Sequence, residues 1–133
     1  MIRQSLGVCP QVNTTFGTLT PAQHLRMFAA LKGFRDEVLS AAVDDTLEKI
    51  GLSERRNTPA RRLSGGQKRK LCLGIALIGQ SRTVFLDEPT ASMDPHSRRT
   101  VWQLLREQRE GRTLVLTTHF LDEVIWQSVV IIR

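Results

Sequence analysis

The alternation of strand-like and helix-like segments in the second half of the chain constrains its fold more than any other feature. Short β-prone runs at residues 83–86, 113–118 and 129–132 are separated by helical patterns, the first of which begins at Asp94-Pro95. Parallel strands need a crossover connection, and a helix usually supplies it. The order strand, helix, strand therefore predicts an α/β fold with a parallel sheet. In the run 113–118, apolar residues are neighbours without clean alternation, which predicts a strand covered on both faces.

The first half of the chain is predicted to be mostly helical after a short strand within residues 5–12. The sequence Thr20-Pro21-Ala22-Gln23 has the capping residue, the early proline and the glutamine of a helix start. A second helix is predicted before Gly51, and a polar connector occupies residues 52–62. A further helix begins at Ser64, and its apolar far half, LCLGIALIG, predicts deep burial.

Composition narrows the function only slightly. The 133 residues include 19 Lys+Arg and 13 Asp+Glu, and this net charge of +6 favours polyanions such as nucleotide phosphates, nucleic acid or an anionic membrane face. A plain solvated basic surface explains the same charge, and we favour that interpretation. Cys9 and Cys72 are too few for a disulfide framework or a zinc site, so we expect two buried thiols. The longest apolar run, residues 71–79, is too short to cross a bilayer, so we expect any membrane link to pass through another domain or chain.

Polar residues follow three of the predicted strands directly. Gln11 follows the first strand, the pair Asp87-Glu88 follows the second, and His119 follows the third. Ligands of open α/β sheets bind at the carboxyl ends of the strands. A carboxylate suits Mg²⁺ bound to phosphates, and a second carboxylate can polarise a water. Taken singly, the acid pair also fits a solvated turn, and a lone histidine is more often a structural hydrogen bonder.

The sequence Leu63-Ser64-Gly65-Gly66-Gln67 places two glycines in the first turn of a helix. Glycine there costs about 1 kcal/mol relative to alanine, so the pair makes sense where something must approach the backbone closely. A helix amino terminus offers free N–H groups to a phosphate. A plain capped helix explains Ser64 and Gln67 but leaves the glycine pair unexplained.

Taken together, these elements resemble the ATPase domain of ATP-binding-cassette (ABC) proteins. The correspondence runs through the Q-loop, signature motif, Walker B strand, D-loop and switch histidine, which match Gln11, LSGGQ at 63–67, VFLDEP at 84–89, SMDP at 92–95 and His119. The finer match is to the A subfamily of full-length lipid exporters, through SLGVCPQVNTTFGTLTPAQHLRMFAALKG, LSGGQKRKLCLGIALIG and DPHSRRTVWQLLREQREGRTLVLTTHFLDE. The resemblance implies a partial P-loop NTPase fold: a Q-loop region (1–19), a helical signature subdomain (20–80) and a truncated parallel sheet with flanking helices (81–133).

The resemblance also implies roles for these residues. Two such domains meet head to tail, with ATP and Mg²⁺ between them. Asp87 would help hold Mg²⁺ and Glu88 would activate the attacking water. His119 would contact the γ-phosphate, and Gln11 would sense Mg²⁺ and water. The remaining set would serve the facing domain's nucleotide or the dimer seam: Ser64, Gly65, Gly66, Gln67 and Asp94. The transmembrane domain of a transporter is the other implied partner, which would place the chain at the cytoplasmic face of a membrane.

The chain departs from the family pattern in one important respect. No G-x-x-x-x-G-K-[ST] sequence occurs among these residues, and that loop normally grips the phosphates. The end, VIWQSVVIIR, also differs. We therefore expect that these residues by themselves neither bind ATP tightly nor hydrolyse it.

Two alternatives remain beside a transporter ATPase segment. The chain fits a non-catalytic or regulatory module that pairs with an intact ABC domain. It also fits a soluble ABC protein that works on nucleic acid, which we disfavour because the A-subfamily resemblance extends beyond the shared motifs. We accordingly expect no nucleic-acid partner.

Overall fold

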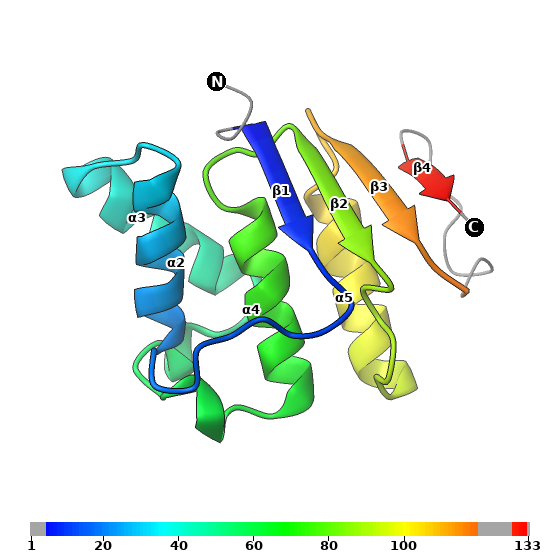
Figure 1. Ribbon diagram of the computed structural model, residues 1–133, viewed down its shortest axis with the longest axis horizontal. Coiled ribbons are helices and arrows are strands. Elements are labelled where there is room, and N and C mark those ends of the chain that lie inside the picture. Colours follow the sequence, from blue (N-terminus) through cyan, green and yellow to red (C-terminus); the bar gives the residue numbers. More distant parts are fainter. Residues whose placement is uncertain (1–4, 120–128, 133) are drawn as a thin grey trace.

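A four-stranded parallel sheet forms one side of the molecule, with its strands in the order β1-β2-β3-β4 (Figure 1). The computed structural model describes residues 5–119 and 129–132. The strands are β1 (Leu6–Cys9), β2 (Thr83–Asp87), β3 (Thr113–Thr117) and β4 (Val129–Ile132). This is the predicted α/β class with a parallel sheet, consistent with part of a P-loop NTPase fold. The short helix predicted after His119 lies outside the described residues.

Helices connect the strands as the sequence predicted. Between β1 and β2 lie α2 (Pro21–Leu31), α3 (Asp36–Lys49) and α4 (Gly65–Leu77), and α5 (Pro95–Glu107) joins β2 to β3. The polar connector contains two short 3₁₀ helices, η1 (Ser53–Arg55) and η2 (Ala60–Arg62). None of the helices in the described part of the chain is long and apolar enough to cross a membrane. The three-part division of the chain stays a prediction.

The helix starts form at the predicted capping residues. The Thr20 hydroxyl accepts a hydrogen bond from the Gln23 amide, and the Gln23 side chain accepts one from the Thr20 amide in return. Ser64 and Gln67 form the same reciprocal pair at the start of α4. These boxes satisfy N–H groups that would otherwise lack partners at a helix start. Three of the predicted helix starts therefore hold, since Asp94 caps α5 as well.

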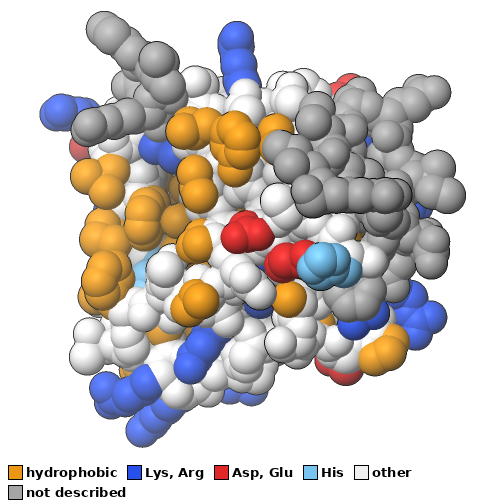
Figure 2. All heavy atoms as spheres, turned by 45° about the vertical axis from the view of Figure 1, so that its right-hand side comes forward, with side chains coloured by type: hydrophobic (Ala, Val, Ile, Leu, Met, Phe, Trp, Pro, Cys, Tyr) orange, Lys and Arg blue, Asp and Glu red, His pale blue; other side chains and the backbone are white. Residues whose placement is uncertain are grey.

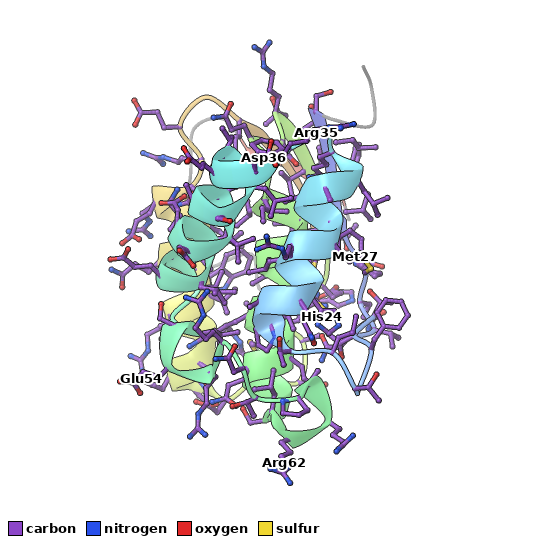
Figure 3. All side chains as sticks on the ribbon, turned by 90° about the vertical axis from the view of Figure 1, so that its left-hand side faces the viewer. His24, Met27, Arg35, Asp36, Glu54 and Arg62 are labelled. Atoms are coloured by element: carbon purple, nitrogen blue, oxygen red, sulfur yellow. The ribbon has the colours of Figure 1, made fainter. Side chains whose placement is uncertain are left out.

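Helices α2 and α3 lie side by side, away from the sheet (Figure 3). His24, near the start of α2, is fully buried. Its Nδ1 lies 2.8 Å from the Thr20 carbonyl oxygen, and its Nε2 accepts from the Phe16 amide at 2.9 Å. The Phe16 ring stacks on the imidazole. These contacts anchor the segment that leads from Gln11 into α2.

Within the described residues, helices cover one face of the sheet, and the prediction that the strand at 113–118 is covered on both faces stays a prediction. Residues of the helix-covered face, such as Leu86, Leu114 and Leu116, are buried. On the opposite face Val8 is 55% exposed and Phe85 is 43% exposed. Val8 pairs with Phe85, and Phe85 with Val115, so these residues form one row across the sheet. Strands β2 and β3 consequently alternate in burial because the helices pack from one side.

The apolar half of α4 lies in the core, as predicted. Leu71, Leu73 and Leu77 are buried, and the helix packs against β1. Cys9 and Cys72 are free and buried, which confirms the prediction of two buried thiols. Burial raises the pKa of Cys9 to about 12 and also raises that of Cys72. Both sulfurs are therefore neutral thiols at physiological pH.

Candidate functional site

The carboxyl ends of the parallel strands bring two of the predicted groups into direct contact. Glu88 follows β2 and His119 lies two residues beyond β3. The His119 Nε2 is 3.3 Å from the Glu88 Oε1. The Glu88 side chain is only 13% exposed, whereas that of His119 is 93% exposed. Figure 2 shows acidic side chains beside a histidine on this face. The arrangement gives a sheltered carboxylate with a histidine at its open side.

Thr117, the last residue of β3, organises the two carboxylates. Its hydroxyl donates to the Asp87 Oδ1. The Glu88 amide in turn donates to the Thr117 carbonyl oxygen at 2.9 Å and to its hydroxyl oxygen at 3.1 Å. Glu88 has a φ of 45°, which is uncommon for a residue with a side chain. Strained conformations of this kind cluster at functional sites because the surrounding contacts must hold them.

A cleft of about 690 Å³ brings together most of the other predicted site residues. It is lined by residues from the loop after β1, the start of α4 and the loop before α5, among them Gln11, Ser64, Gly65, Gly66 and Asp94. Segments far apart in the sequence therefore meet at one surface. The cleft is open to solvent, and its lining is mixed in polarity.

Gln67 does not belong to the residues that line this cleft. Its side-chain oxygen accepts a hydrogen bond from the Ser64 amide at 3.0 Å, so the side chain turns back toward the helix start. Asp94 caps α5 by accepting from the Ser97 amide at 2.9 Å. Hydrogen bonds from Ser97, first through its side chain and then through its backbone, lower the pKa of Asp94. Asp94 is therefore ionised at neutral pH, and it lines the cleft.

The glycine pair at the start of α4 has no reason in the packing of the described residues. A Cβ on Gly65 would meet nothing within 4 Å, and one on Gly66 would come no closer than 4.0 Å to the Ser97 hydroxyl. Neither glycine has a positive φ. Alanine would therefore fit at both positions and would favour the helix. The open space over these two residues is what the close approach of a ligand would require.

Arg69 connects the cleft with the carboxylates, and sequence reasoning missed it. It is 4% exposed, and its guanidinium donates to five main-chain carbonyl oxygens. Those acceptors belong to the loop after β1 and the loop after β2, namely Pro10, Gln11, Asp87, Glu88 and Pro89. A signal was present: Arg69 lies three, four and seven residues before Cys72, Leu73 and Ala76, all on the buried face of α4. The neighbouring Lys68 and Lys70 conceal it in a basic run.

The described residues of this site offer few side chains that could bind a metal ion. The described residues contain no cluster of three or more His, Cys, Asp or Glu side chains that could hold a metal ion. Asp87 is exposed, and one of its oxygens is held by Thr117. A single oriented carboxylate fits the way Mg²⁺ binds beside phosphates, because the metal keeps waters and phosphate oxygens as its other ligands.

Comparison with known proteins adds an independent line of argument. Residues 11–121 match a family model described as "AAA domain, putative AbiEii toxin, Type IV TA system". The chain is 48% identical over 122 residues to the retinal-specific phospholipid-transporting ATPase ABCA4 of Homo sapiens. It is 49% identical to the phospholipid-transporting ATPase ABCA3 of Rattus norvegicus and 48% identical to ABC transporter A family member 6 of Dictyostelium discoideum. Each match covers 92% of this chain and between 5% and 8% of the relative, so the chain spans a small part of the proteins that it matches.

Proposed function

Because the chain belongs to the AAA domain family, as a segment of the A-subfamily ABC transporter ATPase domain, we propose that its residues take part in binding and hydrolysing Mg-ATP. Hydrolysis would drive membrane transport, and the names of two relatives, both phospholipid-transporting ATPases, point to phospholipids as the transported class. The observation that supports the proposal is the pairing of Glu88 with His119 at the sheet edge. Arg69 donates a hydrogen bond to the Glu88 carbonyl oxygen. It thereby connects the Glu88–His119 pair with the cleft at Gly65 and Gly66, the two glycines that packing leaves unexplained.

The proposed division of labour follows from the geometry. Glu88, sheltered and next to His119, would accept the proton of the attacking water, and His119 would donate to a phosphate oxygen. Gln11 would orient that water from the loop after β1. Phosphoryl transfer depends mainly on positioning and charge neutralisation, so a carboxylate held in a fixed position suits this reaction.

Mg²⁺ would be held by Asp87, whose side chain Thr117 orients. The metal would neutralise developing charge on the phosphates. Ser64, Gly65 and Gly66 would meet the nucleotide of a second ABC domain, with Asp94 at the seam between the two domains and Gln67 maintaining the helix start. A transmembrane domain is the further proposed partner, which would place the chain at the cytoplasmic face of a membrane.

The 133 residues alone should bind Mg-ATP only weakly. They contain no G-x-x-x-x-G-K-[ST] loop, whose N–H groups and lysine supply most of the phosphate grip in proteins of this fold. Isothermal titration of the purified chain with Mg-ATP should therefore show no saturation in the micromolar range. Micromolar binding would show instead that other residues provide the grip.

A complementation assay tests whether Ser64, Gly65 and Gly66 of this chain, which we call the signature surface, can act on the nucleotide of another domain. The chain is mixed with an intact A-subfamily ATPase domain whose own signature serine has been replaced, and phosphate release is measured. Wild-type chain should raise the rate, and Gly66→Ala should not, because the new methyl group occupies the open space over the helix start. Gly66→Ala should nevertheless be up to about 1 kcal/mol more stable than wild type, since alanine favours the helix.

Lys70→Met provides the matched control, because it removes a charge from the same helix outside the cleft. It should support the rate as well as wild type does. A rate that wild-type chain leaves unchanged would contradict the proposed function. A chain that binds the intact domain and lowers its rate would support the second candidate, a regulatory module that pairs with an ABC domain.

A further inference from the structure

One buried guanidinium holds both loops of the proposed site. We propose that Arg69 is a positioning residue: it fixes the loop after β1 relative to the loop after β2, and so places Gln11 and Glu88 for the reaction of the proposed function, on which the inference rests. The described structure gives Arg69 no carboxylate partner; its hydrogen bonds all go to main-chain oxygens.

The hydrogen bonds divide between the two loops. Nη1 donates to the carbonyl oxygens of Pro10 at 2.5 Å and Gln11 at 3.2 Å. Nη2 donates to those of Asp87 at 2.9 Å and Glu88 at 3.0 Å, and Nε donates to Pro89 at 2.8 Å. Because the guanidinium is planar and rigid, the N–H donors at its edges set a fixed separation between the loops.

The burial of Arg69 makes this arrangement demanding. A charge removed from water is tolerated only where hydrogen bonds compensate it, and here five carbonyl dipoles do so. The loops cannot move apart without leaving part of the buried cation unsatisfied. Lysine could not replace the fork, because an ammonium group has three donors on a single nitrogen.

The position of Arg69 in the sequence adds a link to the ligand. It lies on α4, the helix that begins with Gly65 and Gly66. A helix is stiff over this short distance, so any displacement of its first turn on closing over a ligand reaches both loops through one side chain. Gln11 and Glu88 would then move together with the signature surface rather than independently.

Two measurements on Arg69→Met and Arg69→Lys test the inference, with Lys70→Met as the control. The first is ¹⁵N relaxation of the chain without nucleotide. In Arg69→Met, the backbone order parameter S² at residues 11–13 and 88–91 should fall from about 0.85, the value of a rigid backbone, to below about 0.6. The order parameters of β2 and β3 should not change. In Arg69→Lys, at most one of these two loops should keep the backbone order that it has in wild type. Lys70→Met should match wild type.

The second measurement is the ATPase rate, as a function of ATP concentration, of a full A-subfamily ATPase domain in which residues 5–119 of this chain replace the corresponding segment behind an intact G-x-x-x-x-G-K-[ST] loop. In that chimera Gln11 and Glu88 act on the nucleotide that their own domain grips. Arg69 lines the cleft, but its donors are occupied by main-chain oxygens, among them those of Gln11 and Glu88. Arg69→Met should therefore lower the maximal rate, by about 10²-fold if the reacting groups shift by an ångström, and change the half-saturating ATP concentration little. Arg69→Lys should recover part of the rate. A purely structural role would instead lower the melting temperature and leave the order of both loops intact.

The outcomes are separable. If Arg69→Met keeps both loops as ordered as Lys70→Met does, the inference is wrong. If the chimera without substitutions hydrolyses no ATP, the proposed function fails, and the relaxation data alone decide whether Arg69 positions the loops. Should Arg69→Met not fold, Arg69→Lys decides: two loops of wild-type order at an unchanged rate would overturn the inference.

Discussion

Glu88 combines a sheltered carboxylate with an unfavourable backbone conformation. Its φ is 45°, a value that glycine adopts more easily than a residue with a side chain. Its amide donates a hydrogen bond to Thr117, and its carbonyl oxygen accepts one from Arg69. Both ends of the residue are therefore held by neighbours in other elements. A conformation of this kind persists only where surrounding contacts impose it, which here fixes the carboxylate near His119.

Replacement of Thr117 by valine tests how much its hydroxyl contributes. The variant keeps the shape of the side chain but loses the donor to the Asp87 carboxylate and one acceptor for the Glu88 amide. The Glu88 amide keeps the Thr117 carbonyl oxygen, so no donor is left without a partner. We expect the free energy of unfolding in urea to fall by about 1 kcal/mol.

Thr113→Val, at the exposed start of the same strand, is the control, and valine there should be close to neutral. Equal stability of the two variants would mean that the Thr117 hydroxyl contributes nothing to the fold.

Helix α4 connects more parts of the molecule than any other helix of the described chain. Its start forms one wall of the cleft, Arg69 in its first half holds both loops, and its apolar half packs in the core against β1. The contact with β1 is unusually close at Gly7. A Cβ on Gly7 would lie 1.9 Å from the Ala76 carbonyl oxygen, which is main chain and cannot rotate away.

Gly7→Ala should therefore destabilise the fold by about 3 kcal/mol or more, because α4 must move away from the sheet. Thermal unfolding followed by circular dichroism measures the loss. Gly17→Ala is the matched control: its Cβ would meet only Arg61 Cβ at 3.5 Å, an ordinary contact. If the melting temperatures of the two variants agree, the close packing of α4 on β1 is not as described.

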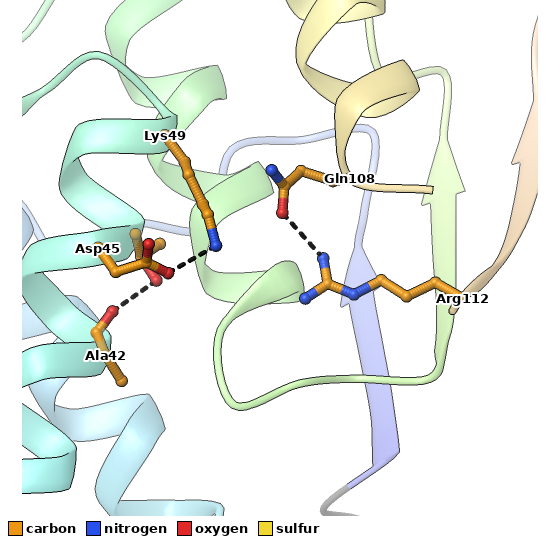
Figure 4. A network of polar contacts seen from close by, with 6 residues as sticks. Ala42, Asp45, Lys49, Gln108 and Arg112 are labelled. Atoms are coloured by element: carbon orange, nitrogen blue, oxygen red, sulfur yellow. Dashed lines mark hydrogen bonds and ion pairs between the residues drawn. The ribbon is translucent and has the colours of Figure 1, made fainter. Parts of the chain in front are cut away.

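A group of charged and polar side chains lies at or just beyond the ends of α2, α3 and α5, near the start of β3. Lys49 pairs with Asp45 within α3, while Arg112, just before β3, donates to Gln108 at 3.3 Å (Figure 4). Lys32 lies close enough to Arg112 to be repelled by it. Its ammonium donates to the Ile78 carbonyl oxygen at 2.6 Å and to the Ser81 hydroxyl at 2.5 Å, so it ties the end of α2 to the connector before β2.

Lys32 makes the stability of the fold depend on pH in the alkaline range. Burial first, and Arg112 second, lower its pKa from 10.5 to about 8. Between these values the unfolded chain binds more protons than the folded chain, so the contribution of Lys32 to stability rises with pH. The difference in free energy of unfolding between wild type and Lys32→Met should therefore be constant below pH 8 and grow in favour of wild type from pH 8 to pH 10.

Urea unfolding of both proteins at several pH values gives this difference directly. The ionisation of Cys9, which acts in the opposite direction, is common to both proteins and cancels. A difference that stays flat or shrinks over this range would show that Lys32 is not desolvated.

The sequence by itself determined the parts of this protein that depend on neighbours along the chain. The helix starts at Thr20, Ser64 and Asp94 follow from local capping chemistry, and the placement of Asp87 and Glu88 after a strand follows from the order of the elements. The parallel sheet followed from the same alternation, because a crossover helix leaves little choice of strand direction.

Only the tertiary structure decided the contacts between segments distant in the sequence. Arg69 reads as one member of a basic run, yet it holds carbonyl oxygens about sixty residues before it and twenty after it. Phe85 lies in an apolar run of the sequence, yet it is 43% exposed because the described helices cover the other face of the sheet. Local pattern cannot reveal either fact, since hydrogen-bond partners and the side of a sheet that is covered depend on how the elements pack, which no short window of sequence contains.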